Sequence, residues 1–200
     1  MKAKFYLIVT VIVIILASLA CGSSNSGVSV NPPNDNAAEV EEQPVAESEA
    51  TEAKAVGSAR SNPAPMGSEV VADDMAFKVL SIIRPADDIV IEGNQFNTKP
   101  ESGQEYLFVE LQITCQKSID EKCSLSSFWN FSVIGSSGVS KDAEWALAGV
   151  EGLLESIDFY GDTTVSGYLP FIVRQDEIDL VFVYEPLLFG DTFYLALPNQ

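Results

Sequence analysis

Tyr106-Leu107-Phe108-Val109-Glu110-Leu111-Gln112-Ile113-Thr114-Cys115 is the stretch that decides the fold expected for this chain of 200 residues. From Leu107 to Cys115 every second residue is apolar or a cysteine, and the residues between them from Glu110 onward are polar. A period of two is typical of a half-buried β-strand, because successive side chains point to opposite faces. The stretch therefore predicts a strand whose inner face, including Cys115, points into a core.

Five further segments show the same enrichment in β-branched and aromatic residues between turn signals. They are residues 77–83, 128–134, 165–173, 179–184 and 192–197. In the segment 128–134 we expect Trp129 to share the inner face with Phe131 and Val133. Residues 141–156 have apolar side chains at mixed spacing, which leaves open whether they form a short helix or a connecting strand.

Short strands with turns between them, and no alternation of strand and helix, predict an all-β antiparallel sandwich. We place this domain at residues 67–200. Residues 21–66 are rich in Glu, Ala, Ser and Pro and contain no aromatic residue. Such a segment cannot bury enough apolar surface to offset its ordering entropy, so we expect a disordered tether. A flexible coil of this length would span roughly 35–40 Å and hold the domain clear of a membrane.

The N-terminus predicts export. Lys2 and Lys4 precede an uncharged apolar run that ends in small residues before Cys21. This arrangement, over residues 1–20, resembles the bacterial lipoprotein signal, in which the cysteine at the cleavage site is lipidated. Leu19 lies one position later than the leucine of the usual lipobox, which leaves open an uncleaved signal anchor. Both interpretations place the rest of the chain outside the cytoplasm, attached to the membrane.

Cys115 and Cys123 are the two cysteines left after Cys21. Outside the cytoplasm an even pair predicts a disulfide, and a separation of eight suits the base of a hairpin loop. A redox pair is the alternative, but it lacks the Cys-x-x-Cys spacing.

Composition excludes several functions. The chain has 29 acidic residues against 11 Lys and Arg, and such a surface repels nucleic acid. It has no histidine, which excludes Ser-His-Asp and Cys-His nucleophile systems and His-ligated metal sites. No glycine-rich phosphate loop is present. We therefore expect no catalysis, no cofactor and no nucleic-acid partner.

Three kinds of candidate site remain. Calcium binds carboxylates on loops, and three acidic groups qualify by position: Asp73 with Asp74, Asp87 and Asp88 with Glu92, and Asp176 and Glu177 with Asp179. Solvated loop charges are the alternative for each. Trp145, and less readily Trp129, could stack a sugar. The face opposite the aliphatic stripe is either an exposed partner surface or is covered by residues 141–156; it comprises Tyr106, Phe108, Tyr168 and Ile172.

The motifs of the domain resemble those of a bacterial lipoprotein domain family of unknown function. The similarity lies in Lys99 to Leu111, in Ser126 to Val133, and in Gly161 to Val173 followed by Leu180 to Tyr184. Arg174 departs from it, since the family has Pro after the Val at 173. The resemblance implies a telokin-like, immunoglobulin-related sandwich, similar in fold to secreted immunoprotective antigens, with no agreed activity and no catalytic residues. Gly103 and Gly161 are expected to serve turns, and Gly167 close backbone packing.

The sequence thus predicts a lipid-anchored sandwich domain that binds a protein of the envelope or the extracellular space, in the manner of an adhesion module. A small-ligand or calcium-binding sensor domain is the alternative.

Overall fold

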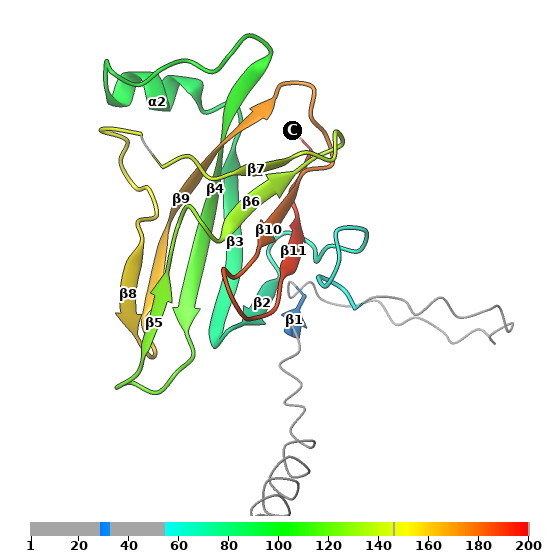
Figure 1. Ribbon diagram of the computed structural model, residues 1–200, viewed down its shortest axis with the longest axis vertical. Coiled ribbons are helices and arrows are strands. Elements are labelled where there is room, and N and C mark those ends of the chain that lie inside the picture. The colour runs from blue at the N-terminus through cyan, green and yellow to red at the C-terminus, as the bar shows by residue number, and fades with distance from the viewer. Residues whose placement is uncertain (1–28, 33–54, 146, 200) are drawn as a thin grey trace, which may run out of the picture.

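Two antiparallel sheets face each other across a shared core in the computed structural model of the protein (Figure 1). The structure describes residues 29–32, 55–145 and 147–199. The predicted signal segment, Cys21 and much of the predicted tether lie outside these ranges. The prediction of an all-β antiparallel sandwich is confirmed.

The first sheet contains five strands, each paired with the next in space. In spatial order they are β1 (Ser29–Asn31), β2 (Glu69–Ala72), β3 (Met75–Ile83), β4 (Gln104–Cys115) and β9 (Thr164–Arg174). The long strands β4 and β9 pair over eleven residues, from Gln104 opposite Arg174 to Thr114 opposite Thr164.

The second sheet contains four strands, and a separate pair extends the sandwich at one side. The order in the second sheet is β11 (Phe193–Ala196), β10 (Val181–Tyr184), β6 (Phe131–Ile134) and β7 (Ser140–Asp142). The separate pair consists of β5 (Lys122–Leu125) and β8 (Ile157–Tyr160). Within the described residues a single α-helix, α2 (Asp87–Gly93), lies between β3 and β4 in the chain.

The main core lies between the two sheets and is rich in phenylalanine. Phe77, Phe171 and Phe182 are fully buried, and the rings of Phe171 and Phe182 meet edge to face across the sheets with 6.3 Å between their centroids. Along β4, Leu107, Val109, Leu111 and Ile113 are all completely buried, as their spacing predicts.

The predicted disorder of residues 21–66 is wrong for two described parts of that segment. Ser29 to Asn31 pair with β2, and the Val30 side chain packs against the main core. Residues 55–66 run beside β11, where the Ala64 amide donates to the Tyr194 carbonyl at 2.9 Å. Ala64 itself is completely buried. The ordered domain therefore includes residues that precede Gly67.

The predicted strand at 128–134 begins only at Phe131, and the prediction that Trp129 lies in the core is wrong. The Asn130 amide donates to the Ser126 carbonyl at 3.3 Å, which closes a turn over residues 126–130. This turn directs Trp129 outward, and 65% of its surface is exposed. A turn closed by backbone hydrogen bonds overrides the strand propensity of the aromatic residues.

Beyond Lys141 and Asp142, which end β7, residues 141–156 form neither the short helix nor the connecting strand that the sequence left open. After β7 ends at Asp142, the described residues of this segment follow turns and irregular backbone. Near its end, Leu153 bridges to Tyr168 in parallel, so residues 152–154 lie along the free edge of β9.

Candidate functional site

A second, smaller core covers the outer face of β4 and β9. Tyr106 and Phe108 of β4 are only 3% and 1% exposed. They pack with Tyr168 and Ile172 of β9 and with apolar residues of the segment after β7. Ala86, just before α2, and Val90, within α2, complete this core. That face is therefore covered, and the alternative of an open partner surface over Tyr106, Phe108, Tyr168 and Ile172 is wrong.

We call residues 143–145 and 147–156 the cover segment. Asn97, in the loop after α2, secures its middle: the Asn97 side-chain nitrogen donates to the Ala148 carbonyl at 2.8 Å, and its oxygen accepts from the Ala148 amide at 3.0 Å. Farther along, the Leu154 amide donates to the Tyr168 carbonyl, and the Tyr168 amide donates to the Gly152 carbonyl, both at 2.8 Å. The cover segment is thus tied to the domain at both of these points.

The glycines named from the sequence have two different roles. Gly103 adopts a positive φ of 86° in the turn before β4, as predicted. A Cβ added at Gly167 would lie 2.8 Å from backbone atoms of Leu154, which confirms close packing. Gly161 lies in the turn that the Thr163 amide closes by donating to the Tyr160 carbonyl at 3.1 Å, as predicted, and a Cβ there would lie 2.2 Å from the Ser118 carbonyl oxygen of the neighbouring loop.

The strongest candidate for a binding site is a cleft of about 580 Å³ at the start of the cover segment. We call it the tryptophan groove. Trp129 and Trp145 are 65% and 78% exposed at its walls. Its lining consists of Phe128, Trp129, Asp142, Ala143, Glu144 and Trp145.

The walls of the groove are held by backbone contacts with both sheets. The Glu144 amide donates to the Pro170 carbonyl of β9 at 2.7 Å, and the Ala143 amide donates to the Phe131 carbonyl of β6 at 3.3 Å. On the other wall, the rings of Phe128 and Trp129 lie 5.5 Å apart. The turn that holds these rings is joined to the end of β10, since the Glu185 amide donates to the Asn130 carbonyl at 2.9 Å.

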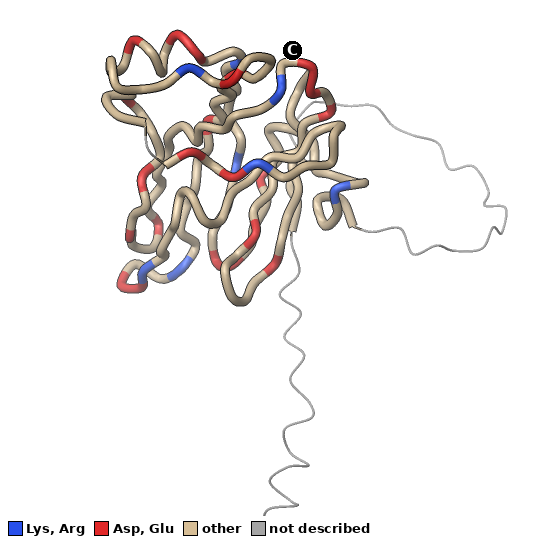
Figure 2. The backbone as a smooth tube through the Cα atoms, turned by 45° about the horizontal axis from the view of Figure 1, so that its top comes forward, with Lys and Arg blue, Asp and Glu red and all other residues tan. Residues whose placement is uncertain are grey.

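The chemistry of the groove favours a positively charged group. Indole faces attract cations through their quadrupole, and tryptophan is the best of the aromatic side chains for this. The acidic residues Asp142 and Glu144 are among those that line the same cleft. Figure 2 shows acidic residues spread over the described chain with fewer basic ones between them, so the surrounding field also favours a cation.

The buried Tyr106 lines a neighbouring hollow that shares Asp142 and Glu144 with the groove. The Tyr106 hydroxyl donates to the Thr98 carbonyl at 3.2 Å. Burial raises the pKa of Tyr106, and the negative charges of Glu144 and Asp87 raise it further. Tyr106 therefore remains a neutral hydrogen-bond donor at physiological pH.

A larger hollow, of about 780 Å³, lies between residues 58–63 and the strands β10 and β11. Arg60 is its cation, and its guanidinium already donates to the Gly135 carbonyl at 2.7 Å. Its lining has no aromatic platform comparable with the paired indoles of the tryptophan groove. We therefore regard it as the weaker candidate.

The first acidic group lies in the turn between β2 and β3. Asp73 and Asp74 both have positive φ, at 52° and 59°. Asp73 accepts a hydrogen bond from the Tyr184 hydroxyl at 2.9 Å, which gives this carboxylate a structural role. The second group opens α2, where Asp87 and Asp88 occupy the first turn at the positive end of the helix.

The third acidic group is divided among separate partners. Asp176 pairs with Arg174 of β9, and Glu177 is buried and accepts from the Ser137 amide at 2.6 Å. Hydrogen bonds from Ser137 and Ser136 and the charge of Arg174 lower the pKa of Glu177, although burial opposes them. Within the described residues no cluster of three or more acidic or cysteine side chains is arranged to hold a metal ion.

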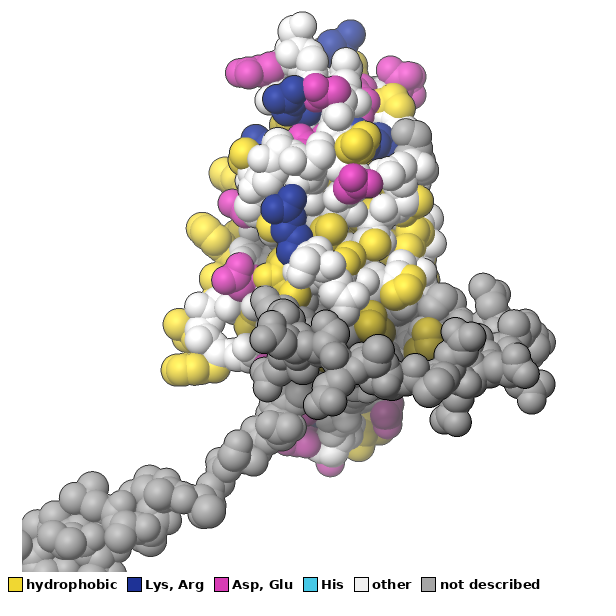
Figure 3. All heavy atoms as spheres, turned by 90° about the vertical axis from the view of Figure 1, so that its right-hand side faces the viewer, with side chains coloured by type: hydrophobic (Ala, Val, Ile, Leu, Met, Phe, Trp, Pro, Cys, Tyr) yellow, Lys and Arg dark blue, Asp and Glu magenta, His cyan; other side chains and the backbone are white. Residues whose placement is uncertain are grey.

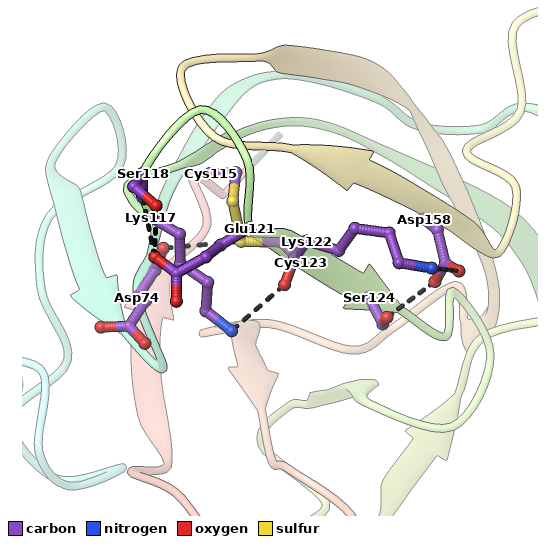
Figure 4. The surroundings of a disulfide bond; sticks show 9 residues. All are labelled: Asp74, Cys115, Lys117, Ser118, Glu121, Lys122, Cys123, Ser124 and Asp158. Carbon is purple, nitrogen blue, oxygen red and sulfur yellow. Dashed lines mark hydrogen bonds and ion pairs between the residues drawn. A yellow bond between two sulfur atoms is a disulfide. The ribbon is translucent and has the colours of Figure 1, made fainter.

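The predicted disulfide is present between Cys115 at the end of β4 and Cys123 in β5 (Figure 4). Both cysteines are buried, with Cα atoms 5.9 Å apart. The loop that they close is also held by Lys117, whose ammonium group donates to the Lys122 carbonyl at 3.2 Å. Burial in the core favours a structural disulfide over the redox alternative.

Several residues of the groove are absent from the candidates drawn from the sequence. The sequence predicts a strand at Phe128 and does not single out Asp142 or Glu144. The stretch Asp142-Ala143-Glu144-Trp145, in which two acidic residues precede a tryptophan, is the local pattern that could have indicated this site. Cys21, the predicted lipidation site, lies outside the described residues. Within those residues, the structure contains no helix of the length and apolarity that a membrane span requires.

No protein-family model matches the chain, and no curated protein matches it. Solved structures with a similar fold include the yjhA protein of Bacillus subtilis, at 14% identity and a TM-score of 0.49, over 67% of this chain and 98% of that one. The Bacillus subtilis protein ycdA, described as "a putative lipoprotein", has 14% identity and a TM-score of 0.48, over 64% of this chain and 38% of that one. The secreted protein MPT63 of Mycobacterium tuberculosis has 10% identity and a TM-score of 0.45, over 68% of this chain and 98% of that one. The likeness concerns the fold alone.

Proposed function

We propose that this protein is an extracytoplasmic binding module, attached to the membrane by a lipid on Cys21, that holds a protein partner through the tryptophan groove. The observation that supports the proposal is the exposure of two indoles, 65% and 78%, over a cleft whose lining also includes two acidic residues. Large aromatic side chains left open to water on a fixed frame are a feature of protein-binding surfaces.

The groove favours a partner that presents an arginine or lysine. A guanidinium group can stack on an indole while it donates hydrogen bonds to a carboxylate, and Trp129 or Trp145 with Asp142 or Glu144 offers both. Tryptophan and arginine are also the residues that dominate the energetics of protein interfaces. The proposed role is recognition, with no chemical step.

The calcium alternative has no comparable support. Asp73, Asp176 and Glu177 are each engaged by a neighbouring side chain or amide. A small cationic ligand would use the same groove as a protein partner, so the test must distinguish the two.

The test is photo-crosslinking on intact cells that express the full chain. A benzophenone amino acid replaces Trp129, and in a control it replaces Ile178, which is 54% exposed on the loop between β9 and β10. We expect a discrete crosslinked protein from position 129 and none from position 178. In the same assay, Trp145→Ala should lower the yield from position 129 about tenfold, which corresponds to about 1.4 kcal/mol of binding free energy.

Equal crosslinking from positions 129 and 178 would contradict the proposal, because it would mean random collision. The small-ligand alternative would be favoured by two results together. No crosslinked protein would be found, and a small quaternary ammonium ion such as choline, added as a ligand, would protect the fluorescence of Trp129 from a quencher in solution.

A further inference from the structure

The loop between β10 and β11 exposes three consecutive large apolar residues. Leu187, Leu188 and Phe189 are 62%, 85% and 92% exposed. Single exposed apolar residues are common on protein surfaces, but an adjacent run of this size costs free energy in water. Figure 3 shows hydrophobic side chains scattered among polar and charged ones over most of the face drawn, and others gathered at its lower left edge.

This loop lies beside the turn between β2 and β3. Gly190 approaches Asp73 so closely that a Cβ on the glycine would lie 2.3 Å from the carboxylate. Tyr184, the last residue of β10, donates its hydroxyl to the same carboxylate. The apolar loop and the β2–β3 turn therefore share one end of the sandwich, the lower end in Figure 1.

The loop closed by the disulfide reaches the same end. Gln116 donates its amide to the Asp74 carbonyl at 2.8 Å, which joins the β4–β5 loop to the β2–β3 turn. Ile119, at the tip of the β4–β5 loop, is 69% exposed. Lys117 and Lys122 flank this tip, with Asp120 and Glu121 between them, and the Lys122 ammonium group pairs with Asp158 at 3.0 Å (Figure 4). This end therefore combines apolar tips with a loop of mixed charge.

The N-terminal chain enters the domain at this end too. Ser29 pairs with Val71 and Asn31 with Glu69, so β1 runs away from the β2–β3 turn. Val30 fixes β1 in place, because its side chain packs on the main core and beside Gly57. Residues 22–28 separate Cys21 from β1. Even fully extended, they reach at most about 28 Å.

We propose that Leu187, Leu188 and Phe189 insert into the membrane that holds Cys21, so that the domain rests on the bilayer by this end. The inference rests on the membrane attachment of the proposed function. Apolar side chains that enter the acyl boundary of a bilayer gain burial free energy in addition to that of the lipid anchor. The apolar loop offers this contact within reach of the short connection, with Ile119 at the same end.

The test places an environment-sensitive probe on the loop of the full lipidated chain. With Cys21 acylated and Cys115 bonded to Cys123, a cysteine introduced at position 188 is the free thiol to be labelled with a nitrobenzoxadiazole dye. The matched control is Phe96→Cys, because Phe96 is 80% exposed on the loop after α2, at the opposite end. Both proteins are reconstituted into phosphatidylcholine vesicles.

We expect the Leu188→Cys probe to gain severalfold in emission, to shift to shorter wavelength and to be quenched by nitroxide groups within the bilayer. The Phe96→Cys probe should report water throughout. In a second experiment the probe is placed at Ile119→Cys, and the triple change of Leu187, Leu188 and Phe189 to Ser should abolish its response on vesicles. Since these side chains are exposed, the triple variant should keep the unfolding midpoint of the parent.

The two possible failures have different signatures. A vesicle-bound protein whose probe at position 188 remains in water would overturn this inference and leave the lipid anchor intact. A protein that does not sediment with vesicles, and whose N-terminal peptide has no lipid mass, would overturn the anchor itself.

Discussion

Gly167→Ala tests how the cover segment is joined to the sandwich. Gly167 lies in β9 opposite Leu111, at the point where residues 152–154 pass along the free edge of β9. An alanine methyl group there would lie 2.8 Å from both the amide nitrogen and the Cα of Leu154, and 3.0 Å from the Gly152 carbonyl oxygen. These neighbours are backbone atoms, so no side-chain rotation can relieve the contacts.

The expected cost follows from this geometry. An ordinary contact begins near 3.4 Å, so the cover segment must move by about 0.6 Å. That movement strains two hydrogen bonds of 2.8 Å between Tyr168 and residues 152 and 154, each worth about 1 kcal/mol. Overpacking adds about 1–3 kcal/mol. We expect the free energy of unfolding to fall by about 2–4 kcal/mol.

The assays are urea denaturation and hydrogen exchange. The amides of Leu154 and Tyr168 should exchange much faster in Gly167→Ala, because they make the strained bonds. Ser166→Ala is the matched control: Ser166 is the exposed neighbour in β9, and its loss should cost less than about 0.5 kcal/mol. If Gly167→Ala retained the parent stability and the protection of both amides, the close contact would not exist in solution.

Three further predictions concern the frame. Arg84 Nε and Glu105 Oε1 lie 2.6 Å apart, and their side chains are only 8% and 10% exposed. Because Glu105→Gln leaves the buried Arg84 charge without its partner, it should lower the free energy of unfolding, measured by urea titration, by about 3–5 kcal/mol. A loss below about 1 kcal/mol would contradict a buried ion pair. Removing the disulfide by the double change Cys115→Ala and Cys123→Ala should lower the free energy of unfolding, measured by guanidinium titration, by about 2–3 kcal/mol. The folded domain of the unreduced parent should show no reactive thiol, and two reactive thiols would refute the disulfide. Burial and a hydrogen bond to the Asp73 carboxylate raise the pKa of Tyr184 above 10.0 in the folded protein. The tyrosine therefore ionises first in the unfolded chain, so stability should be complete below pH 10 and fall above it by up to about 1.4 kcal/mol per pH unit. In thermal melts over the same pH range, the stability of Tyr184→Phe should fall less steeply than that of the parent. Equal slopes in the two proteins would exclude Tyr184 as the cause.

The sequence is sufficient to predict those strands that have one face in the main core. From Val109 to Cys115 buried and partly exposed residues alternate without a break, and the predicted strand is correct. At Tyr106 and Phe108 the alternation ends, because the cover segment and α2 bury the outer face as well. A segment with apolar residues at mixed spacing can cover such a face without any regular period of its own, so its position was not predictable from local pattern.

Long-range pairing explains the other failures. β1 has three residues, and its partner in β2 is about forty positions away in the chain. No local signal in the Ser-, Gly- and Asn-rich surroundings of Val30 distinguishes it from a disordered tether. Trp129 was misplaced for a related reason, since the turn that exposes it is held by Asn130 through contacts with the end of β10.

The pairing of β1 changes the expected distance between the domain and the membrane. A tether of 44 residues would let the tryptophan groove sample a wide range of heights, but only seven residues separate Cys21 from β1, which is paired with the domain. The groove is fixed to β9 at Pro170, which pairs with Phe108 of β4, seven residues from the end of that strand at Cys115. At about 3.4 Å per residue, a domain that stands on its apolar loop holds the groove about 24 Å from that end. Such a height suits a partner that is itself close to the membrane. The orientation of the domain, rather than the length of a stalk, would then determine which partner can reach the groove.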